Sequence, residues 1–128
     1  MSSLTHSQAR TLIDGALAAA RAAGFKPMGV VVVDAAAQVV ASAREDGASA
    51  LRLDIALGKA AAAVGMGVNS RTLTDRAKQL PAFFGAVAAA SQQKFIPQTG
   101  AVLITDAAGR GLGAAGASGG SGDEDEQI

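Results

Sequence analysis

A strand that ends in Asp-Ala-Ala and resumes after a small and a polar residue occurs twice in this chain. The first copy follows the β-branched run 30–33, and the second copy follows residues 103–105. In both copies the aspartate side chain can accept hydrogen bonds from the turn, and the last small residue of the turn favours a positive φ angle. Gly109 adopts such an angle freely, whereas Ala37 would carry about 1 kcal/mol of strain. The repeat therefore predicts two β-hairpins.

Helical patterns precede the first hairpin and separate it from the second. A capping box at residues 5–8 opens a helix over about 7–23, and Gly24 ends it. A second helix is expected over about 49–66, because this segment contains no proline and is rich in helix formers. Residues 69–74 are polar enough to form the connecting loop.

A third helical region is expected over 72–93, and Pro81 is well placed to open a new stretch within it. The apolar face of that stretch would consist of Phe83, Phe84, Val87 and Ala88. The element order is then α-β-β-α-α-β-β. It predicts one α+β domain in which helices pack on an antiparallel sheet of two β-hairpins, a profilin-like or PAS-like layout.

Composition limits the partners that this chain can have. Eleven lysines and arginines balance eleven aspartates and glutamates, so no net charge attracts nucleic acid or an anionic membrane. The absence of cysteine excludes disulfides, thiolate metal sites and a cysteine nucleophile. The first six residues lack the pattern of a secretory signal, so we expect a cytoplasmic protein. A chain with 49% hydrophobic but only 3% aromatic residues has a core of small side chains, and its Ala/Gly-rich surface favours a homo-oligomer.

The glycine-rich stretch near the C-terminus matches a nucleotide-binding motif in letters only. Residues 111–116 read G-x-G-x-x-G, but a dinucleotide site needs a following helix and a βαβ unit. We interpret them as a small-residue strand that lets a helix or partner approach closely. Residues 118–122 lack the Gly-Lys-Ser/Thr of a phosphate loop. The acidic run 123–126 fits a helix N-terminus, where acids complement the helix dipole.

The second expected helix carries the residues best suited to chemistry. Arg52, Ile55, Lys59 and Met66 lie near one stripe, and Asp54 lies about 140° around the helix from Lys59. Lys59 either snorkels as a structural cation or binds an anion or acts as a base. Asp54 either fixes the helix start, pairs with an arginine, or takes part in proton transfer.

Two residues before this helix complete the set. Asp46 belongs to an Asp-Gly turn, and Arg44 either is solvated or holds a carboxylate. We consider Arg44, Asp46, Arg52 and Lys59 as ligand-binding residues, and Lys59 and Asp54 as catalytic residues.

Three segments resemble the GlcG/HbpS family (DUF336, haem-degrading-like or PduO C-terminal-like domains). They are Val32-Val33-Asp34, Asp46-Gly47-Ala48 and the run Asp54-Ile55-Ala56-Leu57-Gly58-Lys59-Ala60. The resemblance implies a single domain over 1–128 and moves Lys59 toward ligand binding. In the family the Ser-Gly-Gly and acidic stretch leads into a last helix, which we expect to be missing or truncated here.

Some members of this family bind haem, so the resemblance makes haem a possible cofactor. His6 is the only histidine, and Met66 is the softer alternative as an axial ligand. Relatives usually have glycine at position 37, a hydroxyl within the run 59–63, and a Gly-Gly-x-Pro-Ile entry to the second hairpin. These departures imply that the ligand differs from the typical one.

Three functions follow from this reading. The first is a small-ligand binding protein for haem, a corrinoid or a small organic acid. The second is an operon-encoded catabolic enzyme that performs acid/base chemistry on an oxo- or hydroxy-acid, and whether the chain is an enzyme stays open. The third is an oligomeric accessory module. A homo-oligomer is expected under each, with neither nucleic acid nor membrane as a partner.

Overall fold

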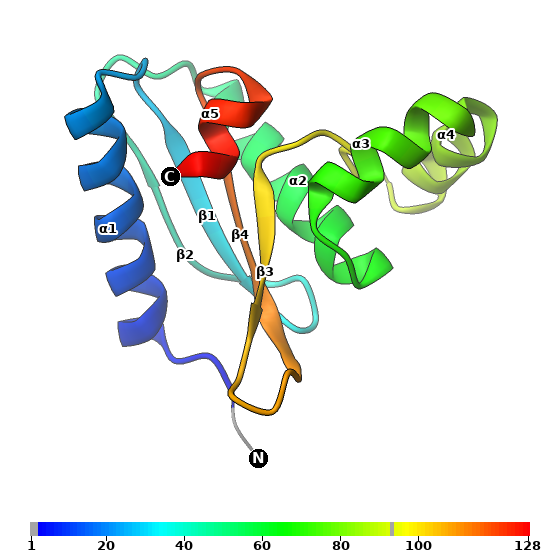
Figure 1. Ribbon diagram of the computed structural model, residues 1–128, viewed down its shortest axis with the longest axis horizontal. Helices are drawn as coiled ribbons and strands as arrows, with labels where there is room; N and C mark the ends of the chain where they lie inside the picture. The colour runs from blue at the N-terminus through cyan, green and yellow to red at the C-terminus, as the bar shows by residue number, and fades with distance from the viewer. Residues whose placement is uncertain (1–2, 93) are drawn as a thin grey trace.

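The computed structural model describes residues 3–92 and 94–128 and forms an α+β fold around one antiparallel sheet (Figure 1). Its elements are α1 (His6–Ala23), β1 (Gly29–Asp34), β2 (Val39–Arg44), α2 (Leu51–Met66), α3 (Ser70–Gln79), α4 (Pro81–Ala90), β3 (Ala101–Thr105), β4 (Gly111–Ser118) and α5 (Gly122–Gln127). The strand order is β2-β1-β4-β3. The two hairpins therefore meet through β1 and β4, and the expected α+β class with two antiparallel hairpins is confirmed.

Both hairpin turns have the conformation that the sequence repeat predicts. Asp34 accepts hydrogen bonds from the backbone N–H groups of Ala36 and Gln38 at 2.9 and 3.0 Å. Asp106 holds the second turn in the same way. The φ angle is 61° at Ala37 and 82° at Gly109, so the alanine occupies the left-handed region as expected.

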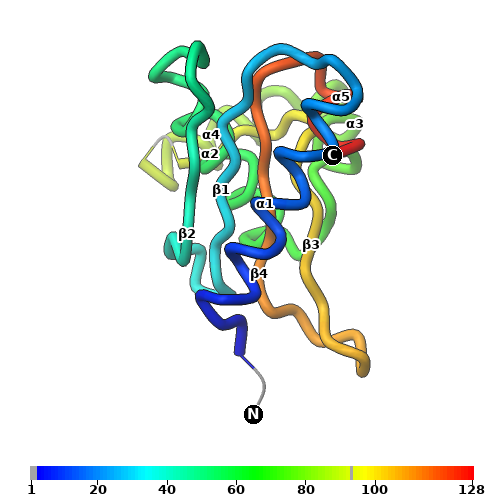
Figure 2. The backbone as a smooth tube through the Cα atoms, turned by 90° about the vertical axis from the view of Figure 1, so that its left-hand side faces the viewer, coloured from blue at the N-terminus to red at the C-terminus, as the bar shows by residue number. Residues whose placement is uncertain are grey.

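Helices cover both faces of the sheet, and β1 is buried between them. Figure 2 shows α1 crossing one face while α2 lies behind the other. Alternate residues of a strand point to opposite faces. Accordingly Val30 and Val32 pack with α1, and Val31 and Val33 pack with α2. The uninterrupted β-branched run of β1 thus supplies the core on both sides.

The glycine-rich strand β4 allows α2 to lie very close to the sheet. A Cβ atom added at Gly116 would lie 2.4 Å from the carbonyl oxygen of Ala56 and 3.2 Å from the Cβ of Ala60. The expected small-residue strand is confirmed, and Gly116 is the glycine that allows the close approach of the helix.

The segment 69–74 was expected to be a loop, and this prediction is wrong because α3 begins at Ser70. The Ser70 hydroxyl accepts from the N–H of Ala101 at 2.8 Å and donates to its carbonyl oxygen at 3.1 Å. With Leu73 fully buried, two inward side chains anchor an otherwise polar helix. Leu73 and Ala77 do have the i, i+4 spacing of a helix, but the polar residues around them led the segment to be interpreted as a loop.

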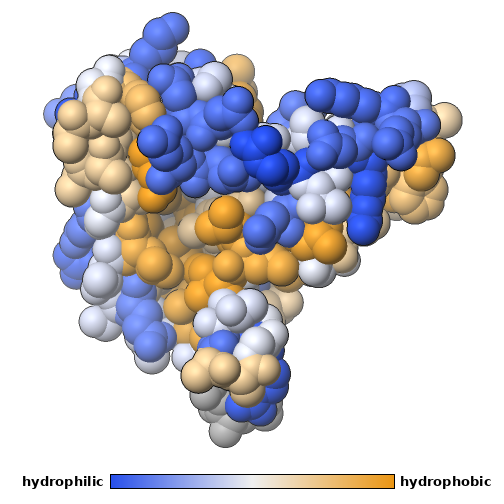
Figure 3. Space-filling view, viewed as in Figure 1, coloured by the Kyte–Doolittle hydropathy of each residue, from blue (hydrophilic) through white to orange (hydrophobic). Residues whose placement is uncertain are grey.

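The expected start of a helix at Pro81 is confirmed, but its expected apolar face is only partly correct. Phe84 is buried and stacks on Phe95, whereas Phe83 is 54% exposed. Together α3 and α4 form an arm that extends away from the sheet (Figure 1). Figure 3 shows hydrophobic surface at the outer end of this arm and in the hollow beside the sheet. The expected end of the region at residue 93 lies outside the described residues.

The acidic run near the C-terminus begins the short helix α5, as predicted. The Ser121 hydroxyl accepts from the N–H of Glu124, whose carboxylate accepts from the N–H of Ser121, so both halves of a capping box are present. Among the described residues, no helix has the length and apolar character needed to cross a bilayer.

Candidate functional site

Lys59 on α2 forms a buried ion pair with Asp125 on α5. The Lys59 Nζ atom donates to Asp125 Oδ2 at 2.9 Å and to the carbonyl oxygen of Ala117 at 3.0 Å. The two side chains are only 6% and 2% exposed. The other oxygen of Asp125 accepts from the N–H of Gly120 at 2.9 Å. In this geometry Lys59 acts as a structural cation that holds the end of β4 and α5 against α2.

The neighbouring backbone leaves just enough room for this ammonium group. Gly100, which precedes β3, has a φ angle of 139°. A Cβ atom at Gly100 would lie 2.7 Å from Lys59 Nζ and 3.0 Å from the carbonyl oxygen of Ala117. Glycine at this position therefore serves both the backbone conformation and the burial of the lysine.

Arg52 lies on α2 two turns before Lys59, and both residues line one polar cleft. The guanidinium of Arg52 donates to the hydroxyl of Ser118 at 3.3 Å. The cleft has a volume of about 370 Å³. It is lined by Arg52, Ile55, Lys59, Gln98, Thr99, Ser118, Gly120, Ser121, Gly122, Asp123 and Asp125. We refer to it below as the Arg52 cleft.

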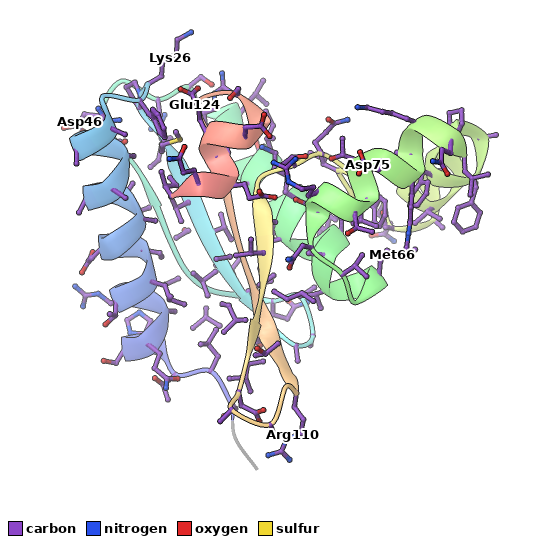
Figure 4. All side chains as sticks on the ribbon, in the orientation of Figure 1. Lys26, Asp46, Met66, Asp75, Arg110 and Glu124 are labelled. Atoms are coloured by element: carbon purple, nitrogen blue, oxygen red, sulfur yellow. The ribbon has the colours of Figure 1, made fainter. Side chains whose placement is uncertain are left out.

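Arg44 and Asp46 were also expected as ligand-binding residues; Arg44 is the last residue of β2, and Asp46 lies in the connection between β2 and α2. Arg44 donates to the carbonyl oxygen of Ala48 at 3.0 Å and so stabilises this connection. Asp46 is exposed in the turn, beside Gly47 with its φ angle of 87°. Figure 4 labels Asp46 at the edge of the molecule. Neither residue is among the described residues that line the Arg52 cleft.

Asp54 and Lys59 are not brought together. Asp54 is exposed on α2, while the Lys59 side chain is buried on another face of the same helix. In the described part of the chain, Asp54 forms an ion pair with neither Arg44 nor Arg52. No ion pair among the described residues includes Asp54, and its catalytic role stays a prediction.

His6 and Met66, the two expected axial ligands of haem, belong to helices on opposite faces of the sheet. His6 is exposed at the start of α1 and lines a groove of about 440 Å³ with Arg10 and Asp14. Met66 ends α2, where Figure 4 labels it close to the α3–α4 arm. One haem iron therefore cannot bind both side chains. Over residues 3–92 and 94–128, no three histidine, aspartate or glutamate side chains group as a metal site.

Met66 lines a largely apolar groove of about 430 Å³ between α2, α4 and the β1–β2 turn. Its lining comprises Ala37, Gln38, Val39, Leu57, Ala61, Gly65, Met66, Val87, Ser91, Lys94 and Phe95. We refer to it as the Met66 groove. It combines hydrocarbon walls with one thioether and one ammonium group.

Sequence reasoning did not identify the residues that hold α5 in place. Asp125 was one of four consecutive acids, and nothing in the run distinguishes it as the buried one. Arg71 on α3 was also missed, although its guanidinium binds Asp123 and, at 3.0 Å, Glu126. The hydrogen bonds to Asp123 and then to Glu126 raise the pKa of Arg71 above its usual value. An arginine far from an acidic run in the sequence is a weak signal for such contacts.

Comparison with known proteins places this fold among haem-related domains. A family model described as haem degrading protein, HbpS-like, matches residues 4–128. The structure is similar to that of HbpS from Streptomyces reticuli, studied as a double mutant, with a TM-score of 0.84 and 28% identity over 99% of this chain and 82% of that one. No curated protein matches the chain significantly in sequence.

Two further structures share the fold. A structure described as a PduOC–haem complex has a TM-score of 0.86 and 25% identity, and the match covers 98% of this chain and 89% of that one. The ORFY protein of Klebsiella pneumoniae has a TM-score of 0.88 over 99% of this chain and 86% of that one. At 22% identity, this last likeness concerns the fold alone.

Proposed function

The chain belongs to the HbpS-like family of haem degrading proteins, and from this premise we propose that it binds haem in the Met66 groove. The likeness to a structure described as a PduOC–haem complex supports haem as the ligand. The observation that carries the choice of site is that one groove combines apolar walls, a thioether and a lysine.

The lining of the groove fits the chemistry of haem. A volume of about 430 Å³ falls within the range of cofactor pockets. Leu57, Val87 and Phe95 would offer hydrocarbon surface to the porphyrin, and the small residues at 61 and 65 would let a flat ring approach α2. The Met66 thioether is a known type of axial haem ligand. When bound, haem would supply a redox-active iron.

Lys94 would hold a propionate at the margin of the groove. Its ammonium group matches a carboxylate as a point charge. The groove on the α1 face contains His6, but it also contains Arg10, Asp14 and Ser42, so its walls are more polar. Met66, rather than His6, would therefore be the residue that binds the haem iron.

A spectrophotometric hemin titration of the purified protein tests this proposal. The wild type is expected to give a shifted Soret band that saturates at one haem per chain. Met66→Leu keeps the apolar wall but removes the thioether, so the Soret position should change. His6→Ala is the matched control and should titrate like the wild type. Lys94→Gln should weaken binding several-fold.

Two results would contradict the assignment. A Soret shift that is lost in His6→Ala and kept in Met66→Leu would place haem on the α1 face. Hemin uptake that never saturates would exclude haem as a specific ligand. The same titration with a corrinoid would then test the other tetrapyrrole.

A second candidate role, an oligomeric module, is favoured by the surface of α4. This helix contains no charged residue, yet Phe83 on it and Leu80 just before it are 54% and 55% exposed. A helix that is apolar all round is normally buried. We therefore expect α4 to pack against another copy of the chain. Light scattering should show an oligomer that Phe83→Glu dissociates, and a monomeric wild type would refute this role.

A further inference from the structure

The Arg52 cleft is separate from the Met66 groove, and the two share no lining residue. Helix α2 contributes different residues to each: Arg52, Ile55 and Lys59 line the cleft, whereas the groove is lined by Leu57, Ala61, Gly65 and Met66. The other walls of the cleft are the end of β4, the residues before β3 and α5, on which Figure 4 labels Glu124. A ligand in the Arg52 cleft would therefore contact none of the residues proposed to bind haem.

The charges around the cleft leave one cation without a carboxylate partner in the described part of the chain. Lys59 and Asp125 neutralise each other at 2.9 Å. Asp123 is 81% exposed and binds Arg71, which lies outside the lining. The ion pairs of the described residues do not include Arg52, whose hydrogen bond to Ser118 is long at 3.3 Å. Arg52 is thus the cation of the lining that no ion pair of the described residues compensates, and the exposed Asp123 adds a carboxylate to the same lining.

Arg52 is well suited to bind a carboxylate, because a guanidinium offers five N–H donors in a planar fork that matches two carboxylate oxygens. Only one of these donors is directed at Ser118. Ser118 lines the cleft, although the residue as a whole is only 1% exposed. Its hydroxyl accepts from Arg52 and keeps its own hydrogen for a second acceptor. Gln98 and Thr99 add polar groups to the lining.

We propose that the Arg52 cleft binds a small monocarboxylate, with the guanidinium of Arg52 as the recognition group and the Ser118 hydroxyl as a second donor. A single guanidinium pairs with one carboxylate, and the carboxylate of Asp123 in the same lining disfavours the second negative charge of a phosphate or a dicarboxylate. A volume of about 370 Å³ accommodates an acid of a few carbon atoms, and Ile55 provides an apolar wall for a short hydrocarbon chain. This proposal does not rest on haem binding.

Isothermal titration of the haem-free protein tests the proposal, with acetate and pyruvate as probes and chloride as the control anion. Pyruvate is expected to bind saturably, and malonate and phosphate more weakly. Arg52→Gln should weaken pyruvate binding about tenfold or more, the usual effect of losing a charged hydrogen-bond donor. Arg52→Lys keeps the charge but loses the fork, so its affinity should fall between those of the wild type and Arg52→Gln.

Arg76→Gln is the matched control, because Arg76 is exposed on α3 and does not line the cleft. It should bind pyruvate like the wild type. Ser118→Ala gives a second test within the cleft and should weaken binding several-fold. If Arg52→Gln does not fold, the pyruvate affinities of Arg52→Lys and Ser118→Ala, each compared with the wild type, still test the proposal.

An unchanged dissociation constant in both Arg52 variants would overturn the proposal, as would acids that bind no better than chloride. The hemin titration tests the role of Met66, and the carboxylate titration tests the role of Arg52. Either proposal can therefore be disproved without affecting the other.

Discussion

Lys59 and Asp125 are separated by 66 residues in the sequence, yet their charged groups meet at 2.9 Å in the protein interior. The pair joins the middle of α2 to α5. Removing one partner of a buried pair leaves the other charge without compensation, which costs more than the pair itself contributes. We therefore regard this contact as the main determinant of where α5 lies.

Asp125→Ala is expected to lower the free energy of unfolding by about 3–5 kcal/mol, because Lys59 would remain buried without a counter-charge. Lys59→Ala should have a similar effect, so it is a poor test of ligand binding. Urea denaturation measures both. The double variant Lys59→Met with Asp125→Leu is the control and should recover most of the loss. A loss below about 1 kcal/mol in Asp125→Ala would indicate a solvated pair.

Gly116→Ala should destabilise the protein by about 1–3 kcal/mol, because its Cβ atom would lie 2.4 Å from the Ala56 carbonyl oxygen and force α2 away from β4. Gly85→Ala on α4 is the matched control, since a Cβ atom there meets nothing within 4 Å. It should stabilise the helix by about 0.5–1 kcal/mol. Thermal or urea unfolding measures the stability of both variants. Equal changes in Gly116→Ala and Gly85→Ala would disprove close packing of α2 on β4.

Ala37→Gly is expected to stabilise the first hairpin by up to about 1 kcal/mol, since alanine is strained in the left-handed conformation that it adopts here. The φ angle of 61° at Ala37 supplies this expectation. Ala36→Gly changes the same turn at a residue without a positive φ angle, so it should give no gain. If both variants lower the free energy of unfolding in urea denaturation, backbone strain at Ala37 does not limit the stability of the hairpin.

The contacts of Arg71 with α5 should make the protection of that helix sensitive to salt. Arg71 is exposed, and ions screen exposed charges. Its raised pKa means that, as the pH rises, this contribution is kept until strongly alkaline pH. Hydrogen exchange of α5 should accelerate with added salt in the wild type and much less in Arg71→Gln. Arg76→Gln, on the same helix, should behave like the wild type.

Patterns within a few residues predicted the local structure well. The aspartate turns at Asp34 and Asp106, the capping box at Thr5 and the helix start at Pro81 all depend on contacts between near neighbours. Such contacts form wherever the backbone adopts the turn, so the sequence specifies them directly. The two hairpins and the α+β class followed from them.

Contacts between distant segments explain where sequence reasoning was incomplete. The helix α3 depends on the Ser70 hydroxyl reaching Ala101, and Ser70 carries no local sign of this partner. Phe83 and Phe84 are neighbours of the same kind, yet only Phe84 meets Phe95. Which of two equivalent side chains becomes buried depends on what the rest of the fold places beside it.

The candidate site shows the same division. The sequence by itself determined that Arg52 and Lys59 lie on one stripe of a helix, because helical geometry fixes the directions of their side chains. Only the tertiary structure decided that Asp125 pairs with Lys59, whereas the ion pairs of the described residues do not include Arg52. It also placed His6 and Met66 on opposite faces of the sheet. The physical reason is that charge compensation and burial depend on distances between segments, which the chain acquires only when it folds.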